Sequence, residues 1–335
     1  MRSRSLYILT TIFLVLSLLS CDKDSGLYTT SDYKLTSADP ILNDSSDYII
    51  VLGDIQTYTC SSFNMPYFKQ TIEWIYSQKL YGKKIGAILQ VGDISDTNSF
   101  FEWDNFHNTV VGLSTEVPIF AVTGNHDYTW HDGLILNRNE TKFNSYIDFP
   151  LTLSQIVTTF EKDKLDNAIY ENVIGNERLD IIALEFGPRK EVLEWANEYV
   201  KNNPERRFVL LTHEFLTAKG QRVSKSSYAE VQFRNTTWSS PEMVWNSLVK
   251  DNDNIVCVLC GHNGFTRQLL SKNNFGREVP QILFNIQYQP HGGDGFIEIW
   301  EIPQNGDIIN AFIYNTITKS LYNGENSSFS FPYKY

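Results

Sequence analysis

Residues 117–127 read VPIFAVTGNHD, and this stretch decides the fold. Its apolar part is β-branched and aromatic and stops at Gly124, as is typical of a buried strand. Asn125, His126 and Asp127 follow at once, and ligands of open α/β sheets bind just outside the carboxyl ends of the strands. Taken alone, the motif could also be a turn with His126 as a cap, because short motifs also occur by chance.

Four other apolar runs end with metal-type ligands, which favours the first interpretation. The runs in the first half alternate with helical patterns, and a β-α-β-α-β series predicts parallel strands with right-handed crossovers. We therefore expect the side chains at the strand ends to lie along one edge. They are Asp54 and Gln56 after residues 48–52, Asp93 after 85–91, His213 after 208–211 and His262 after 255–260, with helices expected at 65–80 and 99–112.

The second half repeats the alternation of strands and helices. Strands are expected at 179–186, 208–211 and 255–260, with helices at 190–201 and 241–250. Three further strands without helices between them, at 281–286, 296–302 and 308–314, are expected to form an antiparallel edge of a second sheet.

Two irregular segments, 128–170 and 219–239, are expected to be loops over the site. His131 lies in the first of them. It could contact a substrate or cap the loop.

Composition narrows the class of protein. The chain has 335 residues, is 42% hydrophobic and has a net charge of -11. This length can bury a large core, and we expect a single domain over residues 48–335. An acidic chain without a basic block argues against a nucleic-acid scaffold role.

The N-terminus is typical of a targeting segment. Arg2 and Arg4 precede an apolar stretch that is too short for a comfortable membrane span. Residues 1–20 are therefore predicted to be a signal peptide. The sequence LLSC ending at Cys21 resembles a bacterial lipobox, in which lipid is attached to the cysteine; an ordinary secretion signal with a chance cysteine is the alternative. Residues 21–47 are expected to be a flexible tether.

The ligand set at the strand ends combines oxygen with imidazole. Such a set suits borderline or hard divalent ions such as Zn, Mn, Fe or Mg. A carboxylate shared between two ions would make a two-metal site, which clamps the attacking and leaving oxygens of a displacement at phosphorus.

With these motifs the sequence resembles the calcineurin-like metallophosphoesterases. That family's pattern is D-x-H, G-D-x-x-D, G-N-H-D/E, a lone His and G-H-x-H, each after a strand. The resemblance implies an α/β fold, a four-layer αββα sandwich of two mixed β-sheets flanked by helices. The matching segments here are residues 54–56 (DIQ), 92–96 (GDISD), 124–127 (GNHD), His213 and 261–264 (GHNG).

The resemblance also implies roles for these residues. Asp93 would bridge two divalent ions, Asp54 and Gln56 would lie on the first, and Asn125, His213 and His262 would complete the second. His126 would assist the leaving group, and Asp127 could orient His126. A metal-bound hydroxide would be the nucleophile.

Two positions depart from the family pattern. Gln56 stands where the family usually has His, and Gly264 stands where its last His belongs. The sequence is similar to a branch of secreted bacterial members with G-D-x-Q and G-H-x-G motifs. Gln289 or His291, beside a glycine-rich turn, could approach the site; the turn could equally be only a hairpin loop.

We therefore expect a metallophosphoesterase that hydrolyses a phosphomonoester or phosphodiester. Its substrate would be a phosphorylated small molecule, or a phosphorylated glycan, lipid or protein. The expected location is the bacterial cell envelope, lipid-anchored and either periplasmic or surface-exposed. The alternative is a catalytically degenerate surface lipoprotein that binds a glycan or nucleotide.

Overall fold

The computed structural model describes residues 33–224 and 227–334 and contains two seven-stranded mixed sheets. The first sheet has the order β15-β14-β13-β1-β2-β3, and β16 pairs with β14. Its strands are β1 (Ser46–Leu52), β2 (Lys84–Gln90), β3 (Ile119–Ala121), β13 (Phe296–Pro303), β14 (Ile308–Asn315), β15 (Ser320–Leu321) and β16 (Ser328–Pro332).

The second sheet has the order β11-β12-β10-β9-β8-β5-β4. A separate hairpin is formed by β6 (Val173–Ile174) and β7 (Glu177–Arg178). The strands of the second sheet are β4 (Ile156–Thr159), β5 (Ala168–Tyr170), β8 (Asp180–Ala183), β9 (Phe208–Leu211), β10 (Ile255–Cys260), β11 (Thr266–Lys272) and β12 (Glu278–Phe284).

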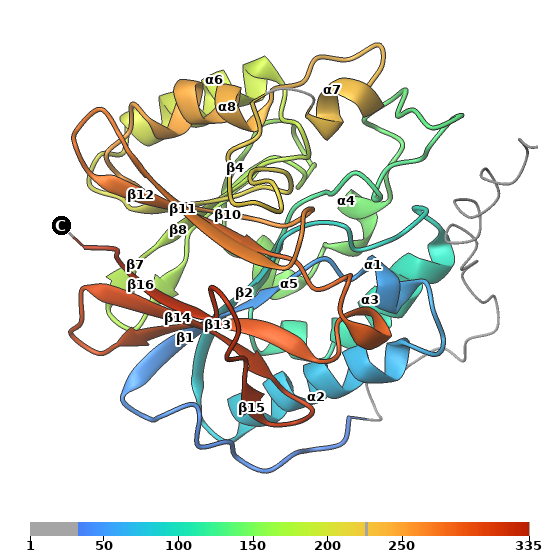
Figure 1. Cartoon of the computed structure of the whole chain (residues 1–335), viewed down its shortest axis with the longest axis vertical. Helices are drawn as coiled ribbons and strands as arrows, with labels where there is room; N and C mark the ends of the chain where they lie inside the picture. Colours follow the sequence, from blue (N-terminus) through green and yellow to red (C-terminus); the bar gives the residue numbers. More distant parts are fainter. Residues whose placement is uncertain (1–32, 225–226, 335) are drawn as a thin grey trace, which may run out of the picture.

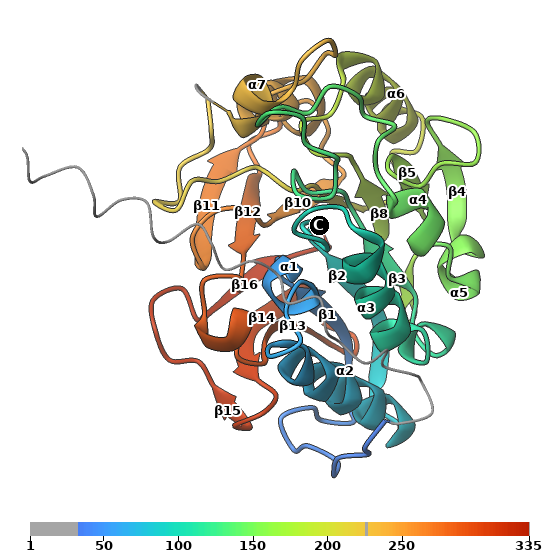
Figure 2. The same cartoon turned by 90° about the vertical axis from the view of Figure 1, so that its right-hand side faces the viewer.

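Helices cover the outer faces of both sheets. Figure 1 shows α6 (Lys190–Lys201) and α8 (Pro241–Val244) over the second sheet, and Figure 2 shows α2 (Met65–Leu80) beside α3 (Phe100–Val110) under the first. The predicted αββα arrangement of two mixed sheets is therefore confirmed. The short helices are α1 (Gln56–Thr59), α4 (Phe143–Tyr146), α5 (Pro150–Leu153), α7 (Tyr228–Gln232), and the single turns η2 (Leu113–Thr115), η3 (Trp245–Val249) and η4 (Pro290–Gly292).

The long helices form where the sequence supplies caps and an apolar stripe. Ser99 begins α3 with a capping box, in which its side chain accepts from the Glu102 N–H and the Glu102 carboxylate accepts in return. In α6, Val192, Leu193, Ala196 and Val200 are buried at helical spacing, and they pack in the outer core beneath the helix.

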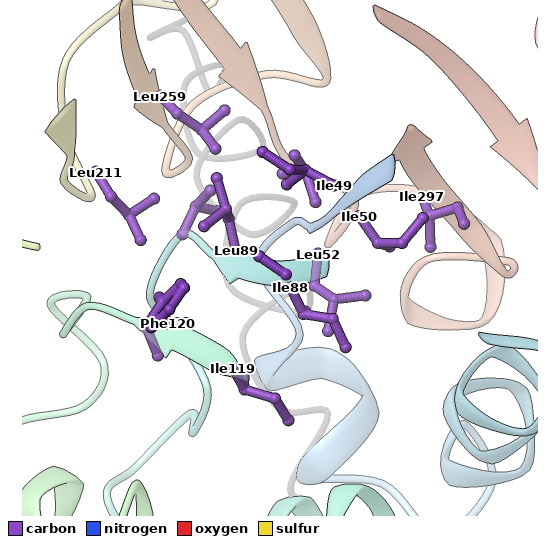
Figure 3. Close-up of a cluster of buried hydrophobic side chains, with 14 of the residues drawn as sticks. Ile49, Ile50, Leu52, Ile88, Leu89, Ile119, Phe120, Leu211, Leu259 and Ile297 are labelled. Carbon is purple, nitrogen blue, oxygen red and sulfur yellow. The ribbon is translucent and has the colours of Figure 1, made fainter. Parts of the chain in front are cut away.

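The main core lies between the two sheets and extends to α2 and α3. Ile49, Leu89 and Phe120 lie on the face of the first sheet that turns toward Leu211 and Leu259 of the second (Figure 3). Their chain neighbours Ile50, Ile88 and Ile119 lie on the opposite face, because successive side chains of a strand alternate (Figure 3). Both faces of these strands are buried, which accounts for their nearly continuous apolar sequence.

Parallel pairing brings the strand ends together. In the first sheet β1, β2 and β3 run parallel, and in the second sheet β8, β9, β10 and β12 do so. Their carboxyl ends meet at the same end of the sandwich.

The prediction for the last three strands was wrong in part. β12 pairs parallel with β10 in the second sheet, and its antiparallel partner is β11. β13 and β14 are antiparallel as expected, but they extend the first sheet, where β13 pairs with β1. An apolar strand pattern shows that a strand is buried and does not show which of two stacked sheets it joins.

Three predicted segments differ in local structure. The helix expected at 241–250 begins as predicted, with the Ser240 side chain accepting from the Met243 N–H, but it continues as the π-helical turn η3. The loop expected at 128–170 contains α4, α5, β4 and β5. The segment 219–239 contains α7.

The described part of the expected tether, residues 33–45, is not free but contacts the domain. The carboxylate of Asp39 accepts from Trp74 Nε1 at 3.1 Å and from the Tyr314 hydroxyl at 2.6 Å, and Leu42 is fully buried. The expected signal peptide and Cys21 lie outside the described residues. Among the residues that are described, no helix combines the length and apolar character that a membrane crossing requires.

Candidate metal centre

The expected ligands meet where the parallel strands of both sheets end. Three of them, Asp93, His213 and His262, are buried, and each offers a ligand atom within 4.8 Å of the others. The Asn125 side-chain oxygen lies 3.2 Å from His213 Nε2, and Asp93 Oδ1 lies 3.2 Å from the same nitrogen. The loops after β2, β3, β9 and β10 thus supply one compact group of two oxygens and two imidazoles.

The two imidazoles are oriented by their surroundings. His213 Nδ1 lies 2.8 Å from the backbone oxygen of Val91, so its Nε2 points into the group. His262 Nδ1 lies 3.2 Å from His213 Nε2, and the ring packs edge-on against Tyr228. His262 Nε2 is buried without a hydrogen-bond partner among the described residues. A divalent ion held by these side chains fits the donor set, because oxygen and imidazole ligands suit Zn, Mn and Fe.

The loop backbones are shaped to let the ligands approach closely. Asp93 and His262 have positive φ angles of 53° and 73°, in the left-handed region that L-residues rarely adopt. Gly124 and Gly261 stand where a side chain would collide with the carboxylates: a Cβ atom would lie 2.1 Å from Asp93 Oδ1 at Gly124 and 2.1 Å from Asp54 Oδ1 at Gly261. The GNHD and GH motifs therefore need glycine for a steric reason.

The other half of the centre contains Asp54 and two glutamine amides. Both Asp54 oxygens accept from the His262 backbone N–H, at 3.1 and 3.0 Å. Gln56 Nε2 donates to Asp93 Oδ2 at 2.9 Å and to Gln287 Oε1 at 2.7 Å. Gln287 Nε2 donates in turn to Asp54 Oδ2 at 3.1 Å. The buried carboxylates of Asp54 and Asp93 are thus joined by a chain of two amides.

Burial and neighbouring charges shift the pKa values of the two carboxylates, Asp54 and Asp93. Burial raises the pKa of Asp54 well above its usual range, and the nearby Asp93 carboxylate raises it further. Burial alone would raise the pKa of Asp93, but the imidazoles of His213 and His126 hold it below its usual range. A cation would keep both carboxylates ionised and both imidazole ligands neutral.

The two candidate ligand imidazoles, His213 and His262, have pKa values shifted in opposite directions. Burial alone would lower the pKa of His213, yet Asp93 raises it to about 9. Burial and the adjacent His213 lower the pKa of His262 to about 3. His213 is therefore the ring that more readily carries a proton, and His262 is the ring that stays neutral. This is expected for two imidazoles that share one pair of carboxylates.

His126 lies beside the group and is held by Asp96. Its backbone N–H donates to Asp93 Oδ1 at 3.0 Å. Its ring Nδ1 lies 2.9 Å from the Asp96 backbone oxygen and 3.2 Å from the Asp96 carboxylate. Burial would lower the pKa of His126, but Asp93 and Asp96 together raise it to about 10.

The expectation that Asp127 orients the His126 ring is corrected. The Asp127 carboxylate accepts from the Gly124 N–H at 2.8 Å and from the N–H and hydroxyl of Ser95 at 2.8 and 3.0 Å. It therefore ties the loop after β3 to the loop after β2. The Asp127 side chain does not contact the His126 ring, and Asp96 orients that ring instead.

An open pocket lies next to His126. Its volume is about 480 Å³, and it is lined by His126, Asp96, Thr97, Thr129 and Trp130. The indole N–H of Trp130 donates to the Asn125 backbone oxygen at 2.9 Å, which fixes the ring 6.0 Å from the His126 ring. The pocket thus offers one indole surface and one carboxylate, while the Thr97 hydroxyl donates to Glu102 and the Thr129 hydroxyl accepts from Asn98.

Two of the three residues with open roles, His131 and His291, have side chains that are held by other partners, and the third, Gln289, is fixed through its backbone. His131 Nε2 lies 2.5 Å from the Glu140 carboxylate in the exposed loop, which favours the loop-capping interpretation. His291 stacks on Tyr67 at 4.2 Å and contacts Asp294. The Gln289 backbone N–H donates to the Ile286 carbonyl within a turn.

Gln287 and Asp96 are the residues that sequence reasoning did not assign. Gln287 ends the segment Asn285-Ile286-Gln287, which follows β12 as Asp54-Ile55-Gln56 follows β1. That repeated spacing was the available signal. Asp96 was visible as the last residue of the GDISD motif.

The sequence of this chain matches a known protein family. The model of the calcineurin-like phosphoesterase family matches residues 48–265. The chain is also similar to uncharacterized protein YvnB of Bacillus subtilis (strain 168), with 27% identity over an alignment of 291 residues that covers 80% of this chain and 20% of that protein. The chain therefore spans about a fifth of the length of this relative.

Two solved structures resemble the chain more distantly. A 5'-nucleotidase precursor from Thermus thermophilus has a TM-score of 0.42 and 12% identity, over 86% of this chain and 54% of that chain. Vacuolar Protein Sorting 29 from Cryptosporidium parvum has a TM-score of 0.32 and 10% identity, over 86% of this chain and 100% of that chain. At these scores neither structure bears on the function.

Proposed function

This chain belongs to the calcineurin-like phosphoesterase family, and from that premise we propose that it hydrolyses a phosphate ester with the help of divalent metal ions. The observation that carries the proposal is the buried group of Asp93, His213 and His262, which offers ligand atoms within 4.8 Å of one another beside His126. Such a group suits a cation and places a proton-transfer side chain next to it.

The residues divide between ligands and helpers. Asp93, Asn125, His213 and His262 would hold one ion, and Asp54 with Asp93 would offer a second, weaker position. When bound, the ions supply positive charge for the phosphoryl oxygens and lower the pKa of a bound water molecule to about 7. The ion identity proposed is Zn, Mn, Fe or Mg.

His126 would assist the leaving group. Its Nδ1 is engaged by Asp96, so Nε2 is the nitrogen left to act on a substrate. The Asp96 carboxylate beside Nδ1 favours the protonated ring, and a protonated Nε2 can stabilise a charged phosphoryl group or donate its proton to the departing oxygen. Asp96 then acts as a positioning residue that fixes the ring.

The pocket beside His126 would receive the leaving group. Trp130 gives it a rigid flat surface, and Asp96, Thr97 and Thr129 add polar groups at its walls. This combination suits an alcohol that carries a ring and hydroxyl groups, as found in phosphorylated sugars and nucleosides. The pocket's carboxylate disfavours a second anionic group there.

Hydrolysis of defined substrates by metal-loaded protein tests the proposal. We expect phosphate release from a phosphomonoester series, or alcohol release from a phosphodiester series, that is lost in His213→Ala. The control is Glu194→Gln on the exposed face of α6, which should match the wild type. A folded, metal-loaded wild type that turns over neither series would overturn the proposal and favour the ligand-binding lipoprotein.

A further inference from the structure

Gln287 closes a chain of hydrogen bonds across the centre. Its Nε2 donates to Asp54 Oδ2 at 3.1 Å and lies 3.4 Å from the His262 backbone oxygen. Its Oε1 accepts from Gln56 Nε2, which also donates to Asp93 Oδ2. The Gln287 backbone N–H donates to Asn285 Oδ1 at 2.9 Å, so the segment that carries the amide is itself held in place.

The direction of this chain is set by the carboxylates. In the ionised form that would hold a cation, a carboxylate only accepts hydrogen bonds, and each amide turns an N–H group toward its carboxylate. Gln56 Nε2 then faces Asp93, and Gln287 Nε2 faces Asp54. Gln56 Oε1 is left buried without a partner among the described residues. The two amides thus place N–H donors on the carboxylates of the first half.

The position that usually supplies an imidazole to this half is a crowded glycine with a positive φ. Gly264 has a φ of +66°, and a Cβ atom there would lie 3.1 Å from both Cα and Cβ of Ala218. A histidine at position 264 would need both a strained backbone and a shift of the β9 loop. The local backbone at position 264 therefore favours glycine over histidine.

We propose that Gln56 and Gln287 form an amide pair that makes the two halves of the centre unequal, so that the protein holds one divalent ion tightly and a second only weakly. An ion entering the first half must displace charge-assisted N–H bonds to Asp54 and Asp93 and gains no imidazole in return. The other half offers His213 and His262. Gln287 is a positioning residue in this scheme, which rests on the proposed metal dependence.

Mn²⁺ binding to the full chain tests the amide pair without using turnover. Isothermal titration and elemental analysis should give one tightly bound ion in the wild type, with the second at least about tenfold weaker. Gln287→Glu replaces a donor with a ligand, and Gln56→His supplies an imidazole. Each should yield two tight ions, visible by electron paramagnetic resonance as a coupled Mn²⁺ pair.

Gln289→Glu is the matched control, because it adds the same charge two residues away in the same segment. It should keep the wild-type stoichiometry. Two ions of equal affinity in the wild type, or a second tight ion in Gln289→Glu, would overturn the amide-pair proposal while leaving hydrolysis untouched. Two tight ions in neither Gln287→Glu nor Gln56→His would also overturn it. A folded wild type that binds no Mn²⁺ would overturn the proposed function as well.

Discussion

The imidazole of His126 contacts both the backbone oxygen and the carboxylate of a single residue, Asp96. Nδ1 lies 2.9 Å from the Asp96 carbonyl oxygen and 3.2 Å from its carboxylate. The two side chains are 37% and 36% exposed, so the pair sits at the surface of the pocket, within reach of a substrate. This geometry fixes which nitrogen of the ring can act.

Replacing His126 with asparagine should separate catalysis from metal binding. His126 contacts Asp93 through its backbone N–H, which the substitution keeps. We expect turnover to fall by about two to four orders of magnitude, as for loss of a general acid, with metal content near that of the wild type. Elemental analysis beside a steady-state assay measures both. Loss of metal in this variant would mean that the ring is a ligand.

Asp96→Asn should change the pH response of His126. Asp93 and Asp96 raise the pKa of His126 to about 10, above the ordinary value of about 6.5. The protonated ring therefore stabilises the folded, metal-free protein fully below about pH 6.5, and this contribution is lost as the pH rises through 10. Removing the Asp96 charge should lower the pKa.

Two measurements follow this change in metal-free protein. An NMR titration of the His126 ring should show a lower pKa in Asp96→Asn. Thermal unfolding should show a deficit for the variant at pH 7 that shrinks above pH 10. An unchanged ring pKa would assign no electrostatic role to Asp96.

Trp130→Ala tests the pocket beside His126. The indole is fixed by its bond to the Asn125 oxygen, and it is the large aromatic surface in the pocket lining. For a substrate whose leaving group carries a ring, we expect KM to rise several-fold, since aromatic stacking contributes about 1 kcal/mol. For methyl phosphate, KM should change little. Equal effects on both substrates would indicate a structural role for Trp130.

Cys21 tests the proposed lipid anchor. We propose that lipid on this cysteine holds the protein at a bacterial membrane, because residues 18–21 read LLSC after an apolar segment. Cys21→Ser should convert a membrane-associated protein into soluble or unprocessed material. Mass spectrometry of the wild type should find an acylated cysteine. Fully soluble wild type without an acyl group would contradict the anchor.

Much of the centre followed from the order of strands along the chain. Asp54, Asp93 and His262 could be expected together because parallel strands end at one edge, whatever the details of the loops. Side-chain direction inside a loop was harder to predict. Asp127 adjoins His126 in sequence, yet the turn aims its carboxylate at Gly124 and Ser95.

The features that the sequence did not predict depend on pairing between distant segments. Gln287 reaches the centre because β12 pairs parallel with β10, whereas the sequence favoured an antiparallel edge there. With that pairing known, a glutamine three residues after the strand would have been an obvious candidate. The choice of β13 for the first sheet depends on which edge of β1 is free to pair, and apolar patterns alone do not encode it.

Gly124→Ala should disrupt the centre for a purely steric reason. A Cβ atom there would lie 2.1 Å from Asp93 Oδ1 and 2.3 Å from the Asp93 backbone nitrogen, so Asp93 or the loop after β3 must move. We expect loss of tight Mn²⁺ binding and a free energy of unfolding lower by about 1–3 kcal/mol, typical of overpacking. Gly86→Ala on β2 is the control, because its Cβ would make only an ordinary 3.4 Å contact with Ile174. Titration calorimetry and thermal unfolding should separate the two variants. Wild-type Mn²⁺ affinity in Gly124→Ala would show that the close approach of this loop to Asp93 does not shape the metal centre.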